Sequence, residues 1–127
     1  MDKVVIDSSA FLAHLNEEAE GDAVGALLSL SMICAVNACE IATKIVAAGR
    51  SFEDAKFILL SAGVEIVDFD LDLAVAAGGM IGKTTPHGLS LGDRACLALA
   101  ARENLPALTA DRAWNGVDVG VEIQFIR

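Results

Sequence analysis

Four acidic residues stand where the predicted strands and helices begin or end. Asp7 closes the first apolar run, and Asp111 follows a later one by two residues. Glu40 and Asp93 fall in the first turns of two predicted helices. In an open parallel sheet, ligands bind beyond the carboxyl ends of the strands. Three of the four acids are therefore expected at one edge of the sheet, and Asp93 joins them if its helix begins at that edge.

Carboxylates that converge in one cleft define a particular chemistry. They repel one another, which costs stability unless protons or cations are bound. Oxygen donors without a matching set of His or Cys suit Mg²⁺ or Mn²⁺. Such a site can generate hydroxide and stabilise both oxygens of an in-line displacement at phosphorus. The four acids therefore predict metal-dependent hydrolysis of a phosphodiester.

Each acid also has a structural explanation. The helix dipole favours acids in any first turn, and both Asn37–Glu40 and Ser90–Asp93 have the spacing of a capping box. Asp111 can be an ordinary N-cap residue. Asp7 is the hardest to explain in this way, because an acid that closes a buried strand is poorly placed for solvent. Capping and metal binding are compatible at one position.

The elements that must position these acids alternate along the chain. Strands are expected at residues 4–6, 31–36, 64–67, 107–109 and 121–126, and helices at 9–15, 19–30, 38–48, 51–62, 71–80 and 91–103. Residues 82–89, rich in Gly and Pro, are predicted to form a loop, and residues 111–114 a single turn. Strands separated by helices imply right-handed βαβ units and helices on both faces of a parallel sheet. No linker divides the chain, so residues 1–127 are expected to form one α/β domain.

The charge of the chain constrains its partners. The formal net charge is −9, whereas proteins that bind nucleic acid non-specifically are usually basic. Bound divalent cations would offset part of this charge locally, and a basic protein partner would be attracted to it.

Composition and cysteine content indicate a globular cytoplasmic protein. The chain is 54% hydrophobic and 21% charged, and 127 residues are enough to bury a core without disulfides. No stretch is apolar enough to span a membrane, and the N-terminus does not resemble a secretory signal. Cys34, Cys39 and Cys96 lack CxxC spacing and are typical of reduced, buried cysteines.

Four segments resemble, in order, the motifs of PIN-domain nucleases, and in particular the VapC-type toxins of toxin–antitoxin pairs. VVIDSSAFLAHL resembles the first motif, a strand that ends in Asp and leads into an apolar helix. NACEIATK resembles the second, which carries Glu, and SLGDRACLALAAREN the third, with Asp early in a helix. LPALTADRAW resembles the fourth, a short strand followed by Thr-x-Asp and an aromatic residue.

This resemblance implies a fold, an activity and a set of partners. The fold is a three-layer α/β/α sandwich around a small, mainly parallel sheet. The activity is a Mg²⁺- or Mn²⁺-dependent endoribonuclease that hydrolyses RNA with metal-activated water at Asp7, Glu40, Asp93 and Asp111. The implied assembly is a homodimer held by an antitoxin, whose C-terminal segment covers the groove with a basic side chain near the acids.

Further residues are candidates for supporting roles. Ser8 and Thr109 are placed to hydrogen-bond to the acids. Lys44, Arg94 and Arg112 flank the acidic motifs and are candidates for contacts with RNA phosphates, although solvated surface charge is the more common role for any one such residue.

Other functions fit the residues less well. The main alternative is a catalytically silent PIN-like domain that binds protein or RNA. A receiver domain is disfavoured, because it needs paired acids after its first strand and Asp7 is followed by two serines. No residue in the sequence is identifiable as a contact to the 2′-hydroxyl of RNA. The choice of RNA rather than DNA as the substrate therefore rests on the resemblance alone.

Overall fold

A five-stranded parallel sheet runs through residues 3–126, which are the residues that the computed structural model describes. The strands are β1 (Val5–Ile6), β2 (Met32–Cys34), β3 (Glu65–Val67), β4 (Ala107–Thr109) and β5 (Ile123–Phe125). Their order is β3-β2-β1-β4-β5, and every neighbouring pair is parallel. After β1, the chain adds β2 and β3 on one side of this strand. It then crosses to the other side of β1, where it forms β4 and β5. The carboxyl ends of β1 and β4 therefore flank the topological switch point, where open sheets bind ligands.

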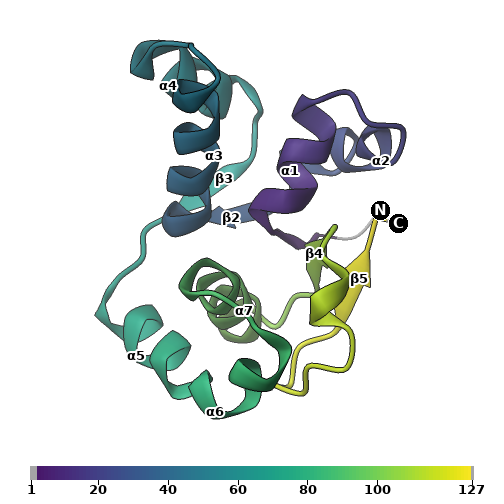
Figure 1. Cartoon of the computed structure of the whole chain (residues 1–127), viewed down its shortest axis with the longest axis vertical. Coiled ribbons are helices and arrows are strands. Elements are labelled where there is room, and N and C mark those ends of the chain that lie inside the picture. The colour runs from purple at the N-terminus through teal and green to yellow at the C-terminus, as the bar shows by residue number, and fades with distance from the viewer. Residues whose placement is uncertain (1–2, 127) are drawn as a thin grey trace.

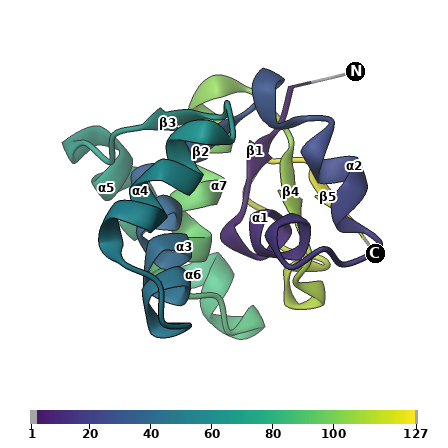
Figure 2. The ribbon, with the colours of Figure 1, turned by 90° about the horizontal axis from the view of Figure 1, so that it is seen from above.

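Helices cover both faces of this sheet, as Figure 1 shows. One layer contains α1 (Ser8–Leu15), α2 (Gly21–Gly25), α3 (Ala35–Ala47) and α4 (Phe52–Ser61), and the other contains α5 (Leu71–Gly79), α6 (Ile81–Thr84) and α7 (Leu91–Glu103). Short 3-10 helices follow at η1 (Leu28–Leu30), η2 (Thr85–His87) and η3 (Arg112–Trp114). In the view from above, α1 and α3 lie in front of the strands and α7 lies behind them (Figure 2). The predicted α/β/α sandwich is thus confirmed. The sheet was expected to be mainly parallel, and every strand pair within the described residues is parallel.

Two hydrophobic clusters, one on each face, hold the layers together. Alternate residues of the first strand segment serve different clusters: Val4 and Ile6 pack with the layer of α1 and α3, whereas Val5 packs with α7. Trp114, fully buried, joins the second cluster. This alternation is the period-2 pattern of a strand covered on both sides.

The predicted helix at residues 19–30 is wrong as a single element. It is divided into α2 and η1, and two glycines explain why. A side chain on Gly21 would collide with the backbone of His14, and one on Gly25 with the His14 imidazole. Glycine at both positions lets this segment pack closely on the end of α1, and glycine also lowers the propensity for a continuous helix.

The capping box predicted for Asn37 and Glu40 is also wrong. Helix α3 begins at Ala35 with Cys34 as its N-cap, so Asn37 lies inside the helix. The strand before it ends sooner than predicted, and the Asn37 amide is buried and turned toward Glu40. By contrast, Ser90 caps α7 through a capping box with Asp93, as its spacing predicts.

The loop predicted at residues 82–89 is mostly helical. It contains α6 and η2, in which the hydroxyl groups of Thr84 and Thr85 donate to backbone carbonyls in the preceding turn. Gly88 then ends the segment with a φ of 69°, a left-handed conformation that favours glycine. This segment leads the chain back to Ser90, where α7 begins.

Candidate functional site

Asp7 occupies the switch point at the end of β1. It is the N-cap residue of α1, yet its side chain makes no capping hydrogen bond and is only 2% exposed. Its Oδ2 atom accepts hydrogen bonds from Ser9 Oγ at 2.6 Å and Thr109 Oγ1 at 2.9 Å. Its Oδ1 atom is buried and has no hydrogen-bond partner among residues 3–126. One oxygen of this carboxylate is therefore fixed by the protein, and the other is left unsatisfied.

The surroundings of Asp7 disfavour its negative charge. Burial raises its pKa from the usual 3.8 to about 6, although the hydrogen bonds from Ser9 and Thr109 act in the opposite direction. The charges of Asp93 and Glu40 contribute to this rise in the pKa. A group with these surroundings binds either a proton or a cation more readily than an ordinary aspartate does.

Thr109, at the end of β4, connects two of the acids. Its hydroxyl donates to Asp7 and accepts the backbone N–H of Asp111 at 3.0 Å. The exposed Asp111 side chain accepts the N–H of Ala113 at 2.9 Å and so caps η3. This hydroxyl therefore links the end of β1 to the turn after β4.

Ser9 is a site residue that sequence reasoning missed in favour of Ser8. Its hydroxyl donates to Asp7 and accepts the N–H of Ala110 at 3.0 Å, so it joins α1 to the chain after β4. Ser8 instead donates to Glu40 Oε1 at 3.0 Å. The signal that could have identified Ser9 is its place in the first turn of the helix that follows Asp7.

Removing the Thr109 hydroxyl should destabilise the fold. Thr109→Val keeps the shape of the buried side chain, but it leaves Asp7 with Ser9 as its one remaining hydroxyl donor and the N–H of Asp111 without its partner. We expect a loss of about 1–3 kcal/mol in the free energy of unfolding, the cost of an unsatisfied buried polar group. Urea denaturation in chelator measures this loss. A midpoint equal to that of the wild type would show that water replaces the hydroxyl at no cost.

Glu40 and Asp93 approach from the two helix layers. Glu40, half-buried on α3, accepts hydrogen bonds from Ser8 and from Asn37 Nδ2, the latter at 2.9 Å. Asp93 Oδ2 accepts the N–H of Ser90 at 2.8 Å within the capping box. Burial raises the pKa of Asp93, the hydrogen bonds with Ser90 lower it, and the charges of Asp111 and Glu40 raise it.

The four acids are electrostatically coupled but do not form a ready chelate. The charges of Asp93 and Glu40 act on the pKa of Asp7, and the charges of Asp111 and Glu40 act on the pKa of Asp93. Within residues 3–126, no three His, Cys, Asp or Glu side chains group closely enough to hold a metal ion. The donors nevertheless fit a hard divalent cation, since all are carboxylate oxygens and the buried Oδ1 of Asp7 lacks a partner.

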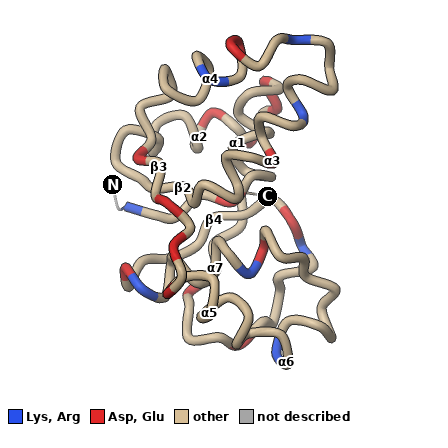
Figure 3. Tube along the Cα trace, turned by 90° about the vertical axis from the view of Figure 1, so that its left-hand side faces the viewer, with Lys and Arg blue, Asp and Glu red and all other residues tan. Residues whose placement is uncertain are grey.

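The three basic candidates differ in their surroundings. Lys44 is exposed on α3, one helical turn after Glu40. Arg94 is half-buried on α7, and its Nε atom has no partner in the described part of the chain. Arg112 is exposed and lies over the Phe125 ring, 4.8 Å from the centroid. Figure 3 shows how few basic positions there are along a trace on which acidic positions predominate.

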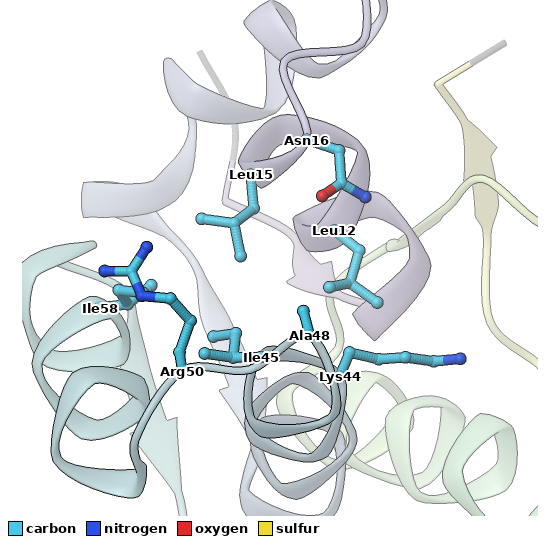
Figure 4. Close-up of a pocket in the computed structure, with 8 residues that line it drawn as sticks. All are labelled: Leu12, Leu15, Asn16, Lys44, Ile45, Ala48, Arg50 and Ile58. Atoms are coloured by element: carbon cyan, nitrogen blue, oxygen red, sulfur yellow. The ribbon is translucent and has the colours of Figure 1, made fainter.

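Two hollows border α3, and one of them reaches Glu40. A groove of about 660 Å³ lies between α1, α3 and α4 and is lined by Leu12, Leu15, Asn16, Lys44, Ile45, Ala48, Arg50 and Ile58. Figure 4 shows Leu12 and Leu15 pointing toward Ile45 and Ala48, with the two cationic side chains at the sides. A second hollow of about 550 Å³, between α3 and the start of α7, is lined by Glu40 and Lys44 among others. Lys44 thus borders both.

Comparison with known proteins identifies the family. Residues 4–120 match the family model described as PIN domain, and the chain therefore belongs to the PIN-domain family. A search of curated protein sequences finds no match.

Solved structures share the fold at low sequence identity. A DNA-bound VapBC from Salmonella typhimurium aligns over 100% of both chains with a TM-score of 0.73 and 18% identity. VapBC2 from Rickettsia felis, bound to a promoter DNA fragment, aligns over 98% of both chains with a TM-score of 0.75 and 14% identity. A toxin–antitoxin complex from Klebsiella pneumoniae covers 90% of this chain and 92% of its own, with a TM-score of 0.71 and 18% identity.

Proposed function

We propose that this chain is a divalent-metal-dependent endoribonuclease and the toxin of a VapBC-type pair. One observation carries the proposal: at the switch point of the sheet, the buried carboxylate of Asp7 has one oxygen fixed by two hydroxyl groups and the other unsatisfied. Glu40, Asp93 and Asp111 lie near enough to interact electrostatically with it or with one another. Such a site suits a cation and a phosphodiester.

Each acid has a proposed role in this reaction. Asp7 and Asp93 are the direct ligands of Mg²⁺ or Mn²⁺, and Glu40 either ligates the ion or orients the attacking water. Asp111 binds a second ion or one of its water molecules. The bound cation supplies activation of water and neutralises charge at the phosphodiester. Ser8 orients Glu40, and Thr109 orients Asp7, through the hydrogen bonds that they donate.

The basic residues around the acids have a proposed role in holding RNA. Lys44, Arg94 and Arg112 neutralise phosphates on either side of the scissile bond. None of these three has a salt bridge within residues 3–126, and so their charges are available to a ligand. Their small number is consistent with a narrow choice of RNA target.

The proposed protein partner is an antitoxin segment with an apolar part and a basic end. Its apolar side chains occupy the groove between α1, α3 and α4 (Figure 4). Because Lys44 borders both hollows, a segment that leaves the groove past this residue arrives beside Glu40. A basic side chain there would meet the acids and compete with the metal ion.

We also propose that the chain forms a homodimer in the cytoplasm. Leu71 and Val75 on α5 are 77% and 67% exposed, which is unfavourable in a monomer. Light scattering at micromolar concentration should therefore give twice the mass of one chain, and Val75→Lys should shift the mass toward that of one chain. A monomeric wild type would contradict this part of the proposal. No helix within residues 3–126 is long and apolar enough to cross a membrane.

The test of the proposed activity is cleavage of mixed RNA and mixed single-stranded DNA pools by the purified protein. We expect RNA cleavage with Mg²⁺ or Mn²⁺, none in chelator, and little or none of the DNA. Metal-dependent cleavage of DNA alone would overturn the choice of substrate. The silent PIN-like domain has one observation in its favour, the lack of a ready metal-binding group in the described residues. Binding of RNA without cleavage in any metal would establish that alternative.

A further inference from the structure

Glu40 is held at one of its two oxygens by donors from two different elements. Ser8, on α1, donates to Oε1 at 3.0 Å, and Asn37, one turn earlier on α3, donates to the same atom at 2.9 Å. Its other oxygen, Oε2, accepts no hydrogen bond from residues 3–126. One oxygen of the carboxylate is thus anchored by two donors, and the other has no hydrogen-bond donor in the described part of the chain.

The side chain of Asn37 is only partly satisfied by the fold. It is fully buried, and its Oδ1 atom has no partner in the described part of the chain. An unsatisfied buried acceptor costs about 1–3 kcal/mol. Glu40 is half-exposed and could accept hydrogen bonds from water instead. What the amide does is connect Glu40 to α7, since the same Nδ2 donates to the carbonyl of Gly92 at 3.0 Å.

Gly92 provides the space in which this carboxylate lies. A Cβ at this position would lie 2.6 Å from Glu40 Cδ and closer still to Oε2. Gly92 is a helical residue without a positive φ, so the backbone itself does not require glycine. The missing side chain lets Glu40 lie against the first turn of α7, whose N–H groups favour a negative charge.

We infer that Asn37 is a positioning residue for Glu40: it anchors Oε1 while the carboxylate lies against the bare backbone of Gly92, and Oε2 keeps its acceptor capacity for a metal ion or its water. The inference rests on the proposed function, because it assigns a purpose to Glu40 only if that carboxylate binds the metal ion or its water.

Gly92→Ala is the sharper of two tests. The three atoms nearest the new methyl group all belong to the flexible Glu40 carboxylate, which must move, and alanine favours the helix. We expect the affinity for Mn²⁺, measured by calorimetry on the full chain, to fall about 10-fold, with the melting temperature in chelator unchanged or raised. Gly78→Ala is the matched control, because an added methyl group at this helical glycine would meet nothing within 4 Å and should leave the affinity unchanged. Unchanged affinity in Gly92→Ala would overturn the inference.

Asn37→Leu tests the same idea through a double-mutant cycle with Glu40→Gln. If Asn37 acts through Glu40, Asn37→Leu weakens Mn²⁺ binding about 10-fold in the wild-type background and has no further effect in Glu40→Gln. An equal loss in both backgrounds would show a general structural effect and overturn the inference. Should Asn37→Leu fail to fold, Gly92→Ala decides alone. Binding that is absent in the wild type, or unaffected by Glu40→Gln, would instead refute Glu40 as part of a metal site, and the inference with it.

Discussion

Mn²⁺ at about one hundred times its dissociation constant should raise the melting temperature of the wild-type protein by about 10 °C, and should leave that of Asp7→Asn unchanged. A ligand that binds only the native state at this concentration stabilises it by about 2.7 kcal/mol, and 1 kcal/mol corresponds to about 4 °C in a domain of this length. Asp7 contributes the only carboxylate oxygen that is both buried and unsatisfied within residues 3–126. Its loss should therefore remove the shift.

A matched variant separates this effect from general loss of negative charge. Asp22 is an exposed acid on α2, and Asp22→Asn changes the net charge by the same amount. Differential scanning fluorimetry with and without Mn²⁺ should give the wild-type shift in this control. An equal shift in Asp7→Asn would show that the metal ion binds elsewhere.

In chelator, Asp7→Asn should be more stable than the wild type at neutral pH. The pKa of Asp7 is about 6 in the native state against 3.8 when unperturbed, so between these values the native state binds more protons than the unfolded state. Stability contributed by this group is therefore present below pH 4 and lost as the pH rises through 6. At about 1.36 kcal/mol for each pKa unit, the loss is about 3 kcal/mol. Asn removes this charge while keeping an oxygen for Ser9 and Thr109.

Urea denaturation in chelator between pH 4.5 and pH 8 measures this difference. The wild type should lose stability relative to Asp7→Asn as the pH rises to 7, and the two curves should approach each other at the acidic end. Asp22→Asn should follow the wild type throughout. If Asp7→Asn were less stable than the wild type at pH 7.5, the charge of Asp7 would already be compensated in the metal-free protein.

Much of the fold follows from local patterns in the sequence. The alternation of short apolar runs with helical segments places all five strands within a few residues of their observed ends. Ser51 and Ser90 each cap the helix that they precede, because capping depends on residues three positions apart. The position of Asp7 was predictable for the same reason, since a strand boundary is a local feature.

The network around the acids depends on contacts between distant segments. Asn37 and Gly92 are 55 positions apart, and Ser9 and Ala110 are 101 apart. No local pattern distinguishes Asn37 as a donor to Glu40 from Asn37 as a helix cap, and the sequence-based interpretation chose the cap. The prediction of a single helix at residues 19–30 was wrong for a similar reason. The need for glycine at positions 21 and 25 is explained only by the backbone and side chain of His14, which lie against them.

The most direct test of the central claim is the rate of RNA cleavage by Asp7→Asn and Asp93→Asn in saturating Mn²⁺, beside the wild type and Asp22→Asn prepared identically. If these carboxylates bind the metal ion at a nuclease site, both variants should cleave at least about 100-fold more slowly, while Asp22→Asn should retain the wild-type rate. Cleavage at the wild-type rate in both Asp7→Asn and Asp93→Asn would contradict the assignment of the site.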